Sequence, residues 1–374
     1  MSATSKPRWR ILLLHAVSRG NATFSYQRAW PRHFAAHPRF EVTALDVADR
    51  RFADRVRSAV AVRRWRGDAI VLLHSVFSNT QMLAGHLLDA IAARREPKAF
   101  FVGNEYKLMP EKIAFAREVG VDLFVSQSSA PEIHALYRRA LGCAVAGIPN
   151  TGLDAGLFCP TRPADERPID LGYRSEPSPP YLGHTEREDI AGWFRAHAAR
   201  HGLTVDISLD PRDRFEEAGW ADFLNRCRGQ LGTEAGGDYF ELTDRTRLAV
   251  NAFQAEHPDA GFAEIHARFF AGYRDGVPLR IMSGRNVEAA GTRTVQLLFE
   301  GRYDGYFRAD EHYIPLKKDF SNADDALRKF ADRAYASAIA ERAYALVTRE
   351  LTYDMLIDRF ERALAGVASP HVVS

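Results

Sequence analysis

The sequence predicts an α/β fold made of two Rossmann-like domains in tandem, followed by C-terminal helices. Short apolar runs alternate with amphipathic helical patterns over the first 150 residues, a stretch rich in Pro, Gly and Asp interrupts them, and the same alternation then restarts. Near-continuous apolar strands separated by helices are typical of a parallel sheet that is covered on both faces. A chain of 374 residues is also long enough to form two hydrophobic cores.

The first predicted domain, 1–150, contains apolar runs that are typical of buried strands. They lie at 10–17, 40–47, 68–75, 98–104, 121–127 and 143–150. Amphipathic segments at 79–95 and 129–141 predict helices between them, and Ser129 is a cap candidate for the second, with Pro131 in its first turn.

The aperiodic stretch 151–168 is interpreted as an interdomain linker, and 169–350 as the second domain. Strands are predicted there at 169–175, 203–210, 229–237, 294–300 and 312–316, with helices at 186–200 and 220–228 and an inserted pair of helices after 237. The last segment, 351–374, is expected to be a helix that packs back on the first domain. Ligands of such sheets bind beyond the carboxyl ends of the strands, so we expect the two domains to face each other across a cleft.

Composition excludes several function classes. The net charge of +2 gives no reason to expect a nucleic-acid partner, and three cysteines without a CxxC pair predict neither a disulfide framework nor a zinc site. There is no apolar run of about 18 residues and no signal peptide pattern, which favours the cytoplasm. The arginine-rich stretch 50–68 is interpreted as a solvated helix face; the alternative is peripheral contact with the inner face of the membrane or with an acidic acceptor. The sequence contains no indication of the oligomeric state.

Familiar catalytic motifs are missing. No GxGxxG follows the first strand, which argues against a dinucleotide oxidoreductase, and neither HExxH nor GxSxG occurs. Polar residues and one glycine stand instead at the ends of predicted strands. In the first domain these are His15, Ser18, Arg19, Gly20, Asn21, His74, Asn104 and Glu105. The alternative for His15 and His74 is a core histidine, and for Asn104 and Glu105 a helix cap.

A second group of polar side chains lies in the second domain. Its members are Tyr173, Arg174, Glu234, Arg280, Ser283, Arg285, Asn286 and Glu288. A helix start binds phosphate through its N–H groups and dipole, arginine adds paired donors, and a carboxylate further along the helix can accept both hydroxyls of a ribose. The group therefore predicts a site for a nucleoside diphosphate. The alternative is an ordinary capped helix with Ser283 as its cap and Glu288 on the surface.

Three stretches of the sequence resemble GT-B glycosyltransferases. "IPNTGLDAGLFCP" (148–160) resembles the crossover between domains in family-four-like members, and "SGRNVEAAGTRTVQLLFEG" (283–301) resembles their donor-site helix. "EHYIPLKKDFSNADDAL" (311–327) resembles the following element of a bacterial subgroup often labelled spore-maturation-like glycosyltransferases.

The resemblance implies a role for each matching position. Glu288 matches the carboxylate that holds the ribose of the nucleotide sugar. Ser283, Arg285 and Asn286 fall near the diphosphate, and Tyr173 and Arg174 fall on a loop that commonly faces the phosphates. Arg280 departs from the pattern, since it stands where family-four members have a sugar-facing Glu, and it could bind a phosphate or an acidic sugar instead.

The resemblance also implies a function. It implies transfer of a hexosyl or related group from a nucleotide diphosphate sugar, the co-substrate, to the hydroxyl of a glycan, lipid-linked or protein acceptor in bacterial polysaccharide or glycoconjugate synthesis. The chain has no DxD motif, so we expect no obligatory metal and no cofactor. The candidate bases for an inverting reaction are His15, His74 and Glu105, whereas a retaining enzyme could use the leaving phosphate. The alternatives are a sugar-nucleotide epimerase of the same fold and a non-catalytic nucleotide-sugar-binding relative.

Overall fold

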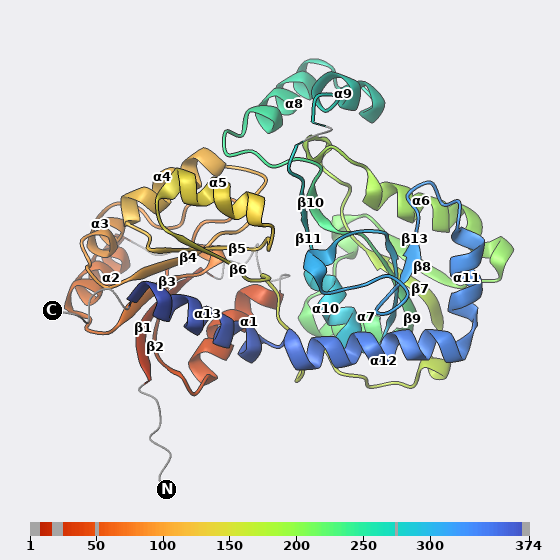
Figure 1. The fold of residues 1–374 in the computed structure, drawn as a ribbon, viewed down its shortest axis with the longest axis horizontal. Coiled ribbons are helices and arrows are strands. Elements are labelled where there is room, and N and C mark those ends of the chain that lie inside the picture. The colour runs from red at the N-terminus through yellow and green to blue at the C-terminus, as the bar shows by residue number, and fades with distance from the viewer. Residues whose placement is uncertain (1–7, 17–24, 49–51, 274–275, 369–374) are drawn as a thin grey trace, which may run out of the picture. The chain divides into compact units, whose positions relative to one another are not determined.

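The computed structural model describes residues 8–16, 25–48, 52–273 and 276–368, which fall into two compact units (Figure 1). Unit 1 comprises Met1–Asn150 and Tyr353–Ser374, and unit 2 comprises Thr151–Thr352. The segment interpreted as a linker, 151–168, therefore belongs to unit 2, where Leu153 and Phe158 are each only 2% exposed. The last helix of the chain, α13 (Tyr353–Ala368), belongs to unit 1.

Unit 1 is built on a six-stranded parallel sheet in the order β2-β1-β3-β4-β5-β6. All residues of β3, β4 and β5 are buried, as expected for strands that are covered on both faces. The six strands predicted from the sequence are confirmed, and their bounds are β1 (Trp9–His15), β2 (Phe40–Asp46), β3 (Ala69–Leu72), β4 (Lys98–Phe101), β5 (Leu123–Ser126) and β6 (Ala144–Gly147).

Six helices in the described part of the chain belong to unit 1: α1 (Ser25–Ala36), α2 (Phe52–Arg64), α3 (His86–Ala92), α4 (Met109–Val119), α5 (Pro131–Leu141) and α13. Ser129 is not the cap of α5, because Ala130 occupies that position without a side-chain hydrogen bond. The helix predicted at 79–95 is shorter than expected, since residues Phe77 and Gln81 pair as a β-bridge before α3 begins. Arg57, Arg63 and Arg64 of α2 are exposed, in line with a solvated helix face.

Unit 2 is built on a five-stranded parallel sheet in the order β13-β12-β9-β7-β8. Its core joins Leu171, Leu231 and Leu297 of three central strands to Phe194 and Phe330 of the covering helices. The bounds are β7 (Ile169–Arg174), β8 (Val205–Ser208), β9 (Cys227–Gly232), β12 (Val295–Phe299) and β13 (Ile314–Leu316), so the predicted strands are confirmed here as well.

In the part of unit 2 that the structure describes, five helices cover this sheet, and two more form an insertion that stands apart from it. They are α6 (Glu186–His197), α7 (Glu217–Arg226), α8 (Arg245–Glu256), α9 (Phe262–Phe269), α10 (Gly284–Gly291), α11 (Ala323–Ala331) and α12 (Arg333–Glu350). Helices α8 and α9 stand apart from the sheet, as Figure 1 shows, and pack around their own cluster of Tyr239, Val250 and Phe270. The predicted insertion is confirmed. Among the described residues, no helix is long and apolar enough to cross a membrane.

A short antiparallel hairpin, β10 (Ala235–Gly237) with β11 (Leu279–Ile281), brackets the insertion and was not predicted. Its register places Gly236 opposite Arg280. A side chain at Gly236 is excluded, because a Cβ there would lie 1.8 Å from the backbone oxygen of Leu279. The pairing fixes where the chain returns from the insertion, directly before α10.

Candidate functional site

A pocket in unit 2 lies beyond the carboxyl ends of β7 and β9, where ligands of parallel sheets bind. Its volume is about 30 Å³. Its lining comes from the two strand ends, the first turn of α6, the loop after β9 and the start of α10: Tyr173, Arg187, Gln230, Leu231, Gly232, Thr233, Glu234, Ala235, Ser283, Arg285 and Asn286.

The floor of the pocket contains a buried amide with no partner. Gln230 is 2% exposed, and both its Oε1 and its Nε2 lack a hydrogen bond to any described residue. Such a group costs free energy unless something satisfies it. Its strand neighbour in register, Gln296, is in contrast fully occupied, since it accepts from Asn286 Nδ2 at 3.0 Å and donates to Asn286 O at 3.1 Å. Gln230 therefore has an unused donor and an unused acceptor at the pocket floor.

The start of α10 forms one wall of the pocket. Ser283 is its N-cap and forms a capping box with Asn286, whose Oδ1 accepts from the Ser283 N–H at 3.0 Å. The cap that the sequence suggested for Ser283 is therefore present, and Asn286 acts mainly as a structural clamp between the cap and β12. The Asn286 N–H already donates to the Ser283 oxygen at 2.9 Å. The N–H groups of Gly284 and Arg285, in contrast, have no acceptor within the helix, and the helix start carries the positive end of the dipole.

Two guanidinium groups face this helix start. Arg285 donates through Nη1 to the backbone oxygen of Arg174 at 2.8 Å, which holds it at the end of β7. Burial lowers the pKa of Arg285, although an arginine stays charged at neutral pH. Arg187 is half-buried in the first turn of α6 and makes no ion pair or hydrogen bond with another described residue. The pocket thus combines two positive side chains with a helix start.

Arg174 and Tyr173 have different positions. Tyr173 lines the pocket but is only 1% exposed. Arg174 is absent from the lining, because its Nη2 pairs with Asp206 of β8 at 2.7 Å and its guanidinium lies over the ring of Phe223 at 4.5 Å. The backbone oxygen of Arg174 therefore helps to position Arg285, whereas its side chain binds Asp206 and Phe223 outside the pocket.

Glu288 lies one turn into α10 and is 5% exposed, so it is not the surface residue of the alternative interpretation. Its Oε2 accepts from Trp220 Nε1 of α7 at 2.7 Å. The structure does not place Glu288 among the residues that line the pocket. The indole fixes the orientation of the carboxylate beside the pocket wall.

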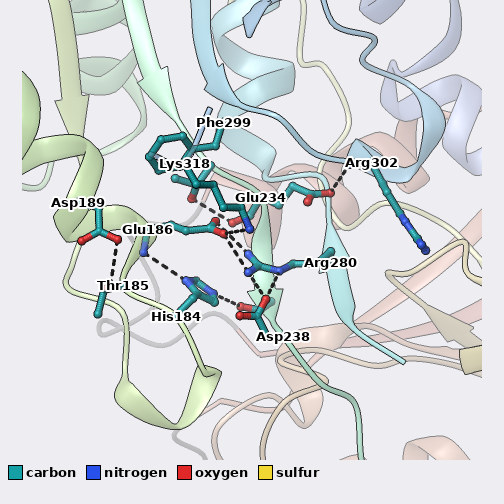
Figure 2. A network of polar contacts seen from close by, with 12 residues as sticks. His184, Thr185, Glu186, Asp189, Glu234, Asp238, Arg280, Phe299, Arg302 and Lys318 are labelled. Carbon is teal, nitrogen blue, oxygen red and sulfur yellow. Dashed lines mark hydrogen bonds and ion pairs between the residues drawn. The ribbon is translucent and has the colours of Figure 1, made fainter. Parts of the chain in front are cut away.

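Arg280 lies in a network of charged groups, which Figure 2 shows. Its Nη1 and Nη2 donate to the two oxygens of Glu186 at 3.0 Å each, and its Nε donates to Asp238 Oδ1 at 3.0 Å. Lys318 adds a second cation to Glu186 at 2.6 Å. With its side chain only 7% exposed, Arg280 binds protein carboxylates in this structure, rather than the phosphate or acidic sugar suggested by the sequence.

Two further groups border this network. His184 accepts from the Glu186 N–H at Nδ1 (3.4 Å) and contacts the Gly236 oxygen through Nε2 (3.0 Å), an arrangement that fits a neutral ring. Burial and the neighbouring Arg280 lower the pKa of His184 to about 4. Glu234 accepts from the backbone N–H groups of Arg302 and Tyr303, at 3.0 and 2.7 Å, while burial raises its pKa. Glu234 thus ties the loop after β12 to the pocket wall (Figure 2).

The candidate base Glu105 in unit 1 is occupied by structural contacts. It is 2% exposed, and its oxygens accept from Ser126 Oγ (2.7 Å), Gln127 N (2.6 Å) and Tyr137 Oη (2.6 Å). Burial raises the pKa of Glu105 despite these donors. A carboxylate enclosed in this way holds the ends of β4 and β5 together, which argues against a role as general base.

The two candidate histidines of unit 1 differ in environment. His74 is 3% exposed, packs against Tyr26, Trp30 and Phe101, and has its pKa lowered to about 3 by burial. It is therefore a core histidine, as the alternative interpretation had it. His15 is half-buried at the carboxyl end of β1. The neighbouring candidates Ser18, Arg19, Gly20 and Asn21 lie outside the described residues.

Asn104 does not act as a helix cap. Its Nδ2 donates to Ser78 Oγ at 3.0 Å, and its own backbone has a φ of 47°. The N-cap of α4 is Leu108, which has no side-chain hydrogen bond. Over the described residues, no group of three or more His, Cys, Asp and Glu side chains is arranged to hold a metal ion.

Sequence reasoning missed Arg187, Gln230 and Thr233. Arg187 could have been found, because it directly follows the start of the helix after the first strand of the second domain. Gln230 shows a weaker signal, a single amide inside the otherwise apolar strand "CRGQLG". Thr233 carries no local signal.

No family model matches this chain, and no curated protein does either. Several solved structures are similar to it over nearly its whole length. HepE from Anabaena, solved in complex with UDP-glucose, is 12% identical with a TM-score of 0.58, over 96% of this chain and 100% of that one. A sucrose-phosphate synthase from Thermosynechococcus elongatus is 11% identical with a TM-score of 0.54, over 96% and 100% of the two chains.

A glycosyltransferase from Rickettsia africae ESF-5 is 7% identical with a TM-score of 0.51, over 97% of this chain and 99% of that one. At these identities the similarity is one of fold, and this chain builds that fold from two units with parallel sheets of six and five strands. The chain has the GT-B fold.

Proposed function

We propose that this chain is a glycosyltransferase that moves a sugar from a nucleoside diphosphate sugar to an acceptor hydroxyl. The observation that carries the proposal is the pocket of unit 2, where the start of α10, Arg187, Arg285 and the unpartnered amide of Gln230 converge. HepE, which shares the fold, was solved with UDP-glucose, and this supports a uridine nucleotide as the first donor to test.

Different residues bind the diphosphate and the ribose of the donor. The N–H groups of α10 and the guanidiniums of Arg187 and Arg285 bind the diphosphate, and they stabilise the charge that develops as it leaves. Glu288, oriented by Trp220 at 2.7 Å, accepts the ribose hydroxyls. No step requires a metal, because the cationic groups of the protein neutralise the leaving group.

Unit 1 is proposed to bind the acceptor, which is a glycan, a lipid-linked saccharide or a protein. Among its three candidate bases, Glu105 and His74 are enclosed, and His15 remains as the base of an inverting reaction. A retaining reaction uses the leaving phosphate and needs none of them. Replacement of His15 by Ala separates the two routes, because only the inverting one loses turnover.

Nucleotide binding is the first test. Titration calorimetry with uridine, guanosine, cytidine and adenosine diphosphates is expected to show one preferred base. At about a hundred times its dissociation constant, that nucleotide should stabilise unit 2 by about 2.7 kcal/mol. Arg285→Gln should weaken binding by about tenfold or more, whereas Arg195→Gln, an exposed arginine on the same unit, should not. Failure of all four nucleotides to bind would refute the proposal.

Turnover separates this proposal from the other functions of the fold. A transferase releases nucleoside diphosphate in proportion to an added acceptor, an epimerase changes the donor sugar without an acceptor, and a non-catalytic relative does neither.

EDTA is expected to leave the rate unchanged, and a loss restored by Mg²⁺ or Mn²⁺ would contradict metal independence. The motif at 311–327 supports a place in the spore-maturation-like subgroup, and polysaccharide precursors are therefore the first acceptors to supply.

A further inference from the structure

A second and larger cavity lies at the opposite end of the same sheet. It has a volume of about 690 Å³, which is within the range of small-molecule sites. Arg228 lines it near the amino end of β9, and Val295 lines it at the amino end of β12. The donor pocket described above lies beyond the carboxyl ends of β7 and β9, so the two cavities share no lining residue.

Positive charge dominates the lining of this cavity. Five arginines face two carboxylates, those of Asp165 and Glu341; the arginines are Arg162, Arg167, Arg228, Arg293 and Arg333. Like charges that crowd into one concave surface repel one another, and low-dielectric walls strengthen their field. The arrangement is costly for the empty protein and favourable for a protein with a bound anion.

Arg167 contributes a buried charge without a carboxylate. It is 5% exposed and donates to the backbone oxygens of Cys227 (3.0 Å) and Thr292 (2.8 Å) and to Thr294 Oγ1 (2.9 Å). Burial lowers its pKa to about 10, so it remains protonated at neutral pH. No carboxylate in the described part of the chain forms an ion pair with it, so its field extends into the cavity.

Arg162 and Arg333 are exposed at the cavity, and neither side chain makes an ion pair or hydrogen bond with a described residue. Arg333 is the first residue of α12, where the helix dipole adds further positive charge. An arginine at a helix start is electrostatically unfavourable by itself. The pair is therefore available to a ligand.

Arg228 and Arg293 are held in place and only partly neutralised. Arg228 Nη1 pairs with Asp170 at 2.6 Å, and its guanidinium lies over the ring of Phe330 at 5.1 Å. Arg293 Nε lies 2.6 Å from Glu341, an ion pair without hydrogen-bond geometry, and its guanidinium lies over the ring of Tyr344 at 3.9 Å. Ring stacking orients both side chains before any ligand arrives, which lowers the entropy cost of binding.

We propose that this cavity is a second binding site, for a phosphate monoester whose organic part rests on Phe330, Ala336 and Ala340. A phosphate monoester carries close to two negative charges, and its oxygens accept the paired donors of guanidinium groups. The excess of arginines over carboxylates matches such a dianion better than it matches a single carboxylate. The apolar lining matches an attached carbon skeleton. The source of the phosphate is either a soluble ester or the headgroup of an anionic lipid.

The test uses the full chain and phenyl phosphate, with phenol as the uncharged control, in calorimetric titrations. The double variant Arg162→Gln/Arg333→Gln removes two exposed charges that the fold does not need. Arg195→Gln/Arg212→Gln removes the same charge from exposed sites of unit 2 outside the cavity. Phenyl phosphate is expected to bind the wild type and the control variant, and to bind the cavity variant about tenfold more weakly or worse. The Arg285→Gln variant should bind it normally, which separates this site from the donor pocket.

Vesicles distinguish the two sources. Co-sedimentation with phosphatidylcholine vesicles, with and without phosphatidic acid, is measured for the same variants. Binding that needs phosphatidic acid and is lost in the cavity variant identifies a lipid headgroup, whereas binding of phenyl phosphate alone identifies a soluble ester. The proposal is overturned if neither probe binds above its control, if the cavity variant binds like the wild type, or if the control variant weakens binding as much as the cavity variant does.

Discussion

Arg280 is the main counter-charge of the buried carboxylate of Glu186. Glu186 and Arg280 are each 7% exposed, and loss of the guanidinium leaves Glu186 and Asp238 without their main counter-charge. Burial by itself would raise the pKa of Glu186, and Arg280, with His184 and Lys318, lowers it overall. The folded pKa thus lies below the unfolded one, so the stabilisation is present at neutral pH and is lost as acid protonates the carboxylate.

The Arg280→Gln variant is therefore expected to lose about 3 kcal/mol of unfolding free energy at pH 7, measured by urea denaturation, because a buried charge loses its partner. Arg212→Gln breaks an ion pair whose arginine is 88% exposed, and should leave the midpoint unchanged. Equal midpoints for Arg280→Gln and the wild type would show that the network contributes no stability. The same result would favour the interpretation from the sequence, in which Arg280 binds the substrate.

His74 makes the stability of unit 1 depend on pH. Its pKa is about 3 in the fold, against an ordinary value of 6.5, so below pH 6.5 the unfolded chain binds a proton that the folded chain does not. Stability is then fully present above pH 6.5 and declines as the pH falls toward 3. Relative to His74→Phe, the wild type should lose about 2 kcal/mol between pH 7 and pH 5, measured by urea unfolding at both values. A difference that does not change with pH would mean that the ring has the same pKa in the folded and unfolded chains, as a solvated ring would.

The start of α10 shows how closely one element must approach its neighbour. A Cβ on Gly284 would lie 2.4 Å from Thr151 Oγ1 and 2.9 Å from its Cβ. Gly284→Ala should therefore shift the helix start, lower the unfolding free energy by about 1–3 kcal/mol, and weaken nucleoside diphosphate binding, because the N–H groups of α10 move. Thr151→Gly/Gly284→Ala relieves the contact and should recover much of the affinity in calorimetry. If the double variant bound the nucleotide as weakly as the single variant, the contact with Thr151 would not be the cause of the loss.

The central strands of both sheets could be predicted from sequence, because each is a continuous apolar run between helices. β10 and β11 could not, since each has three residues and their sequences, "AGG" and "LRI", show no strand pattern. Predicted site residues near the end of a strand or the start of a helix, such as Tyr173 and Arg285, do line the pocket. The ion pairs of Arg280 could not be predicted from the sequence, because its partners Glu186 and Asp238 lie 94 and 42 residues away along the chain. The missing partner of Gln230 is likewise a property of packing that no local pattern encodes.

At the scale of the whole molecule, the chain passes from one unit to the other twice, after Asn150 and after Thr352. The second passage returns α13 to unit 1, where Phe360 is fully buried against Phe34, Phe40 and Phe101. Unit 1 therefore cannot complete its core until the end of the chain has been synthesised. Unit 2, in contrast, is continuous from Thr151 to Thr352 and contains every lining residue of the proposed donor pocket.

Phe360→Ala tests this division of roles. Truncation of a buried Phe costs about 3–5 kcal/mol, and the loss should fall on unit 1, seen as faster hydrogen exchange of β1 to β5 by mass spectrometry. Exchange in β7, β9 and β12 should be unchanged, and so should the dissociation constant of the preferred nucleoside diphosphate, while transfer to an acceptor declines because unit 1 is proposed to bind it. Leu248→Ala, at a position 55% exposed on α8, is the matched control and should alter none of these quantities. If Phe360→Ala weakened nucleotide binding about tenfold at a temperature where unit 2 stays folded, the donor site would have to include residues of unit 1.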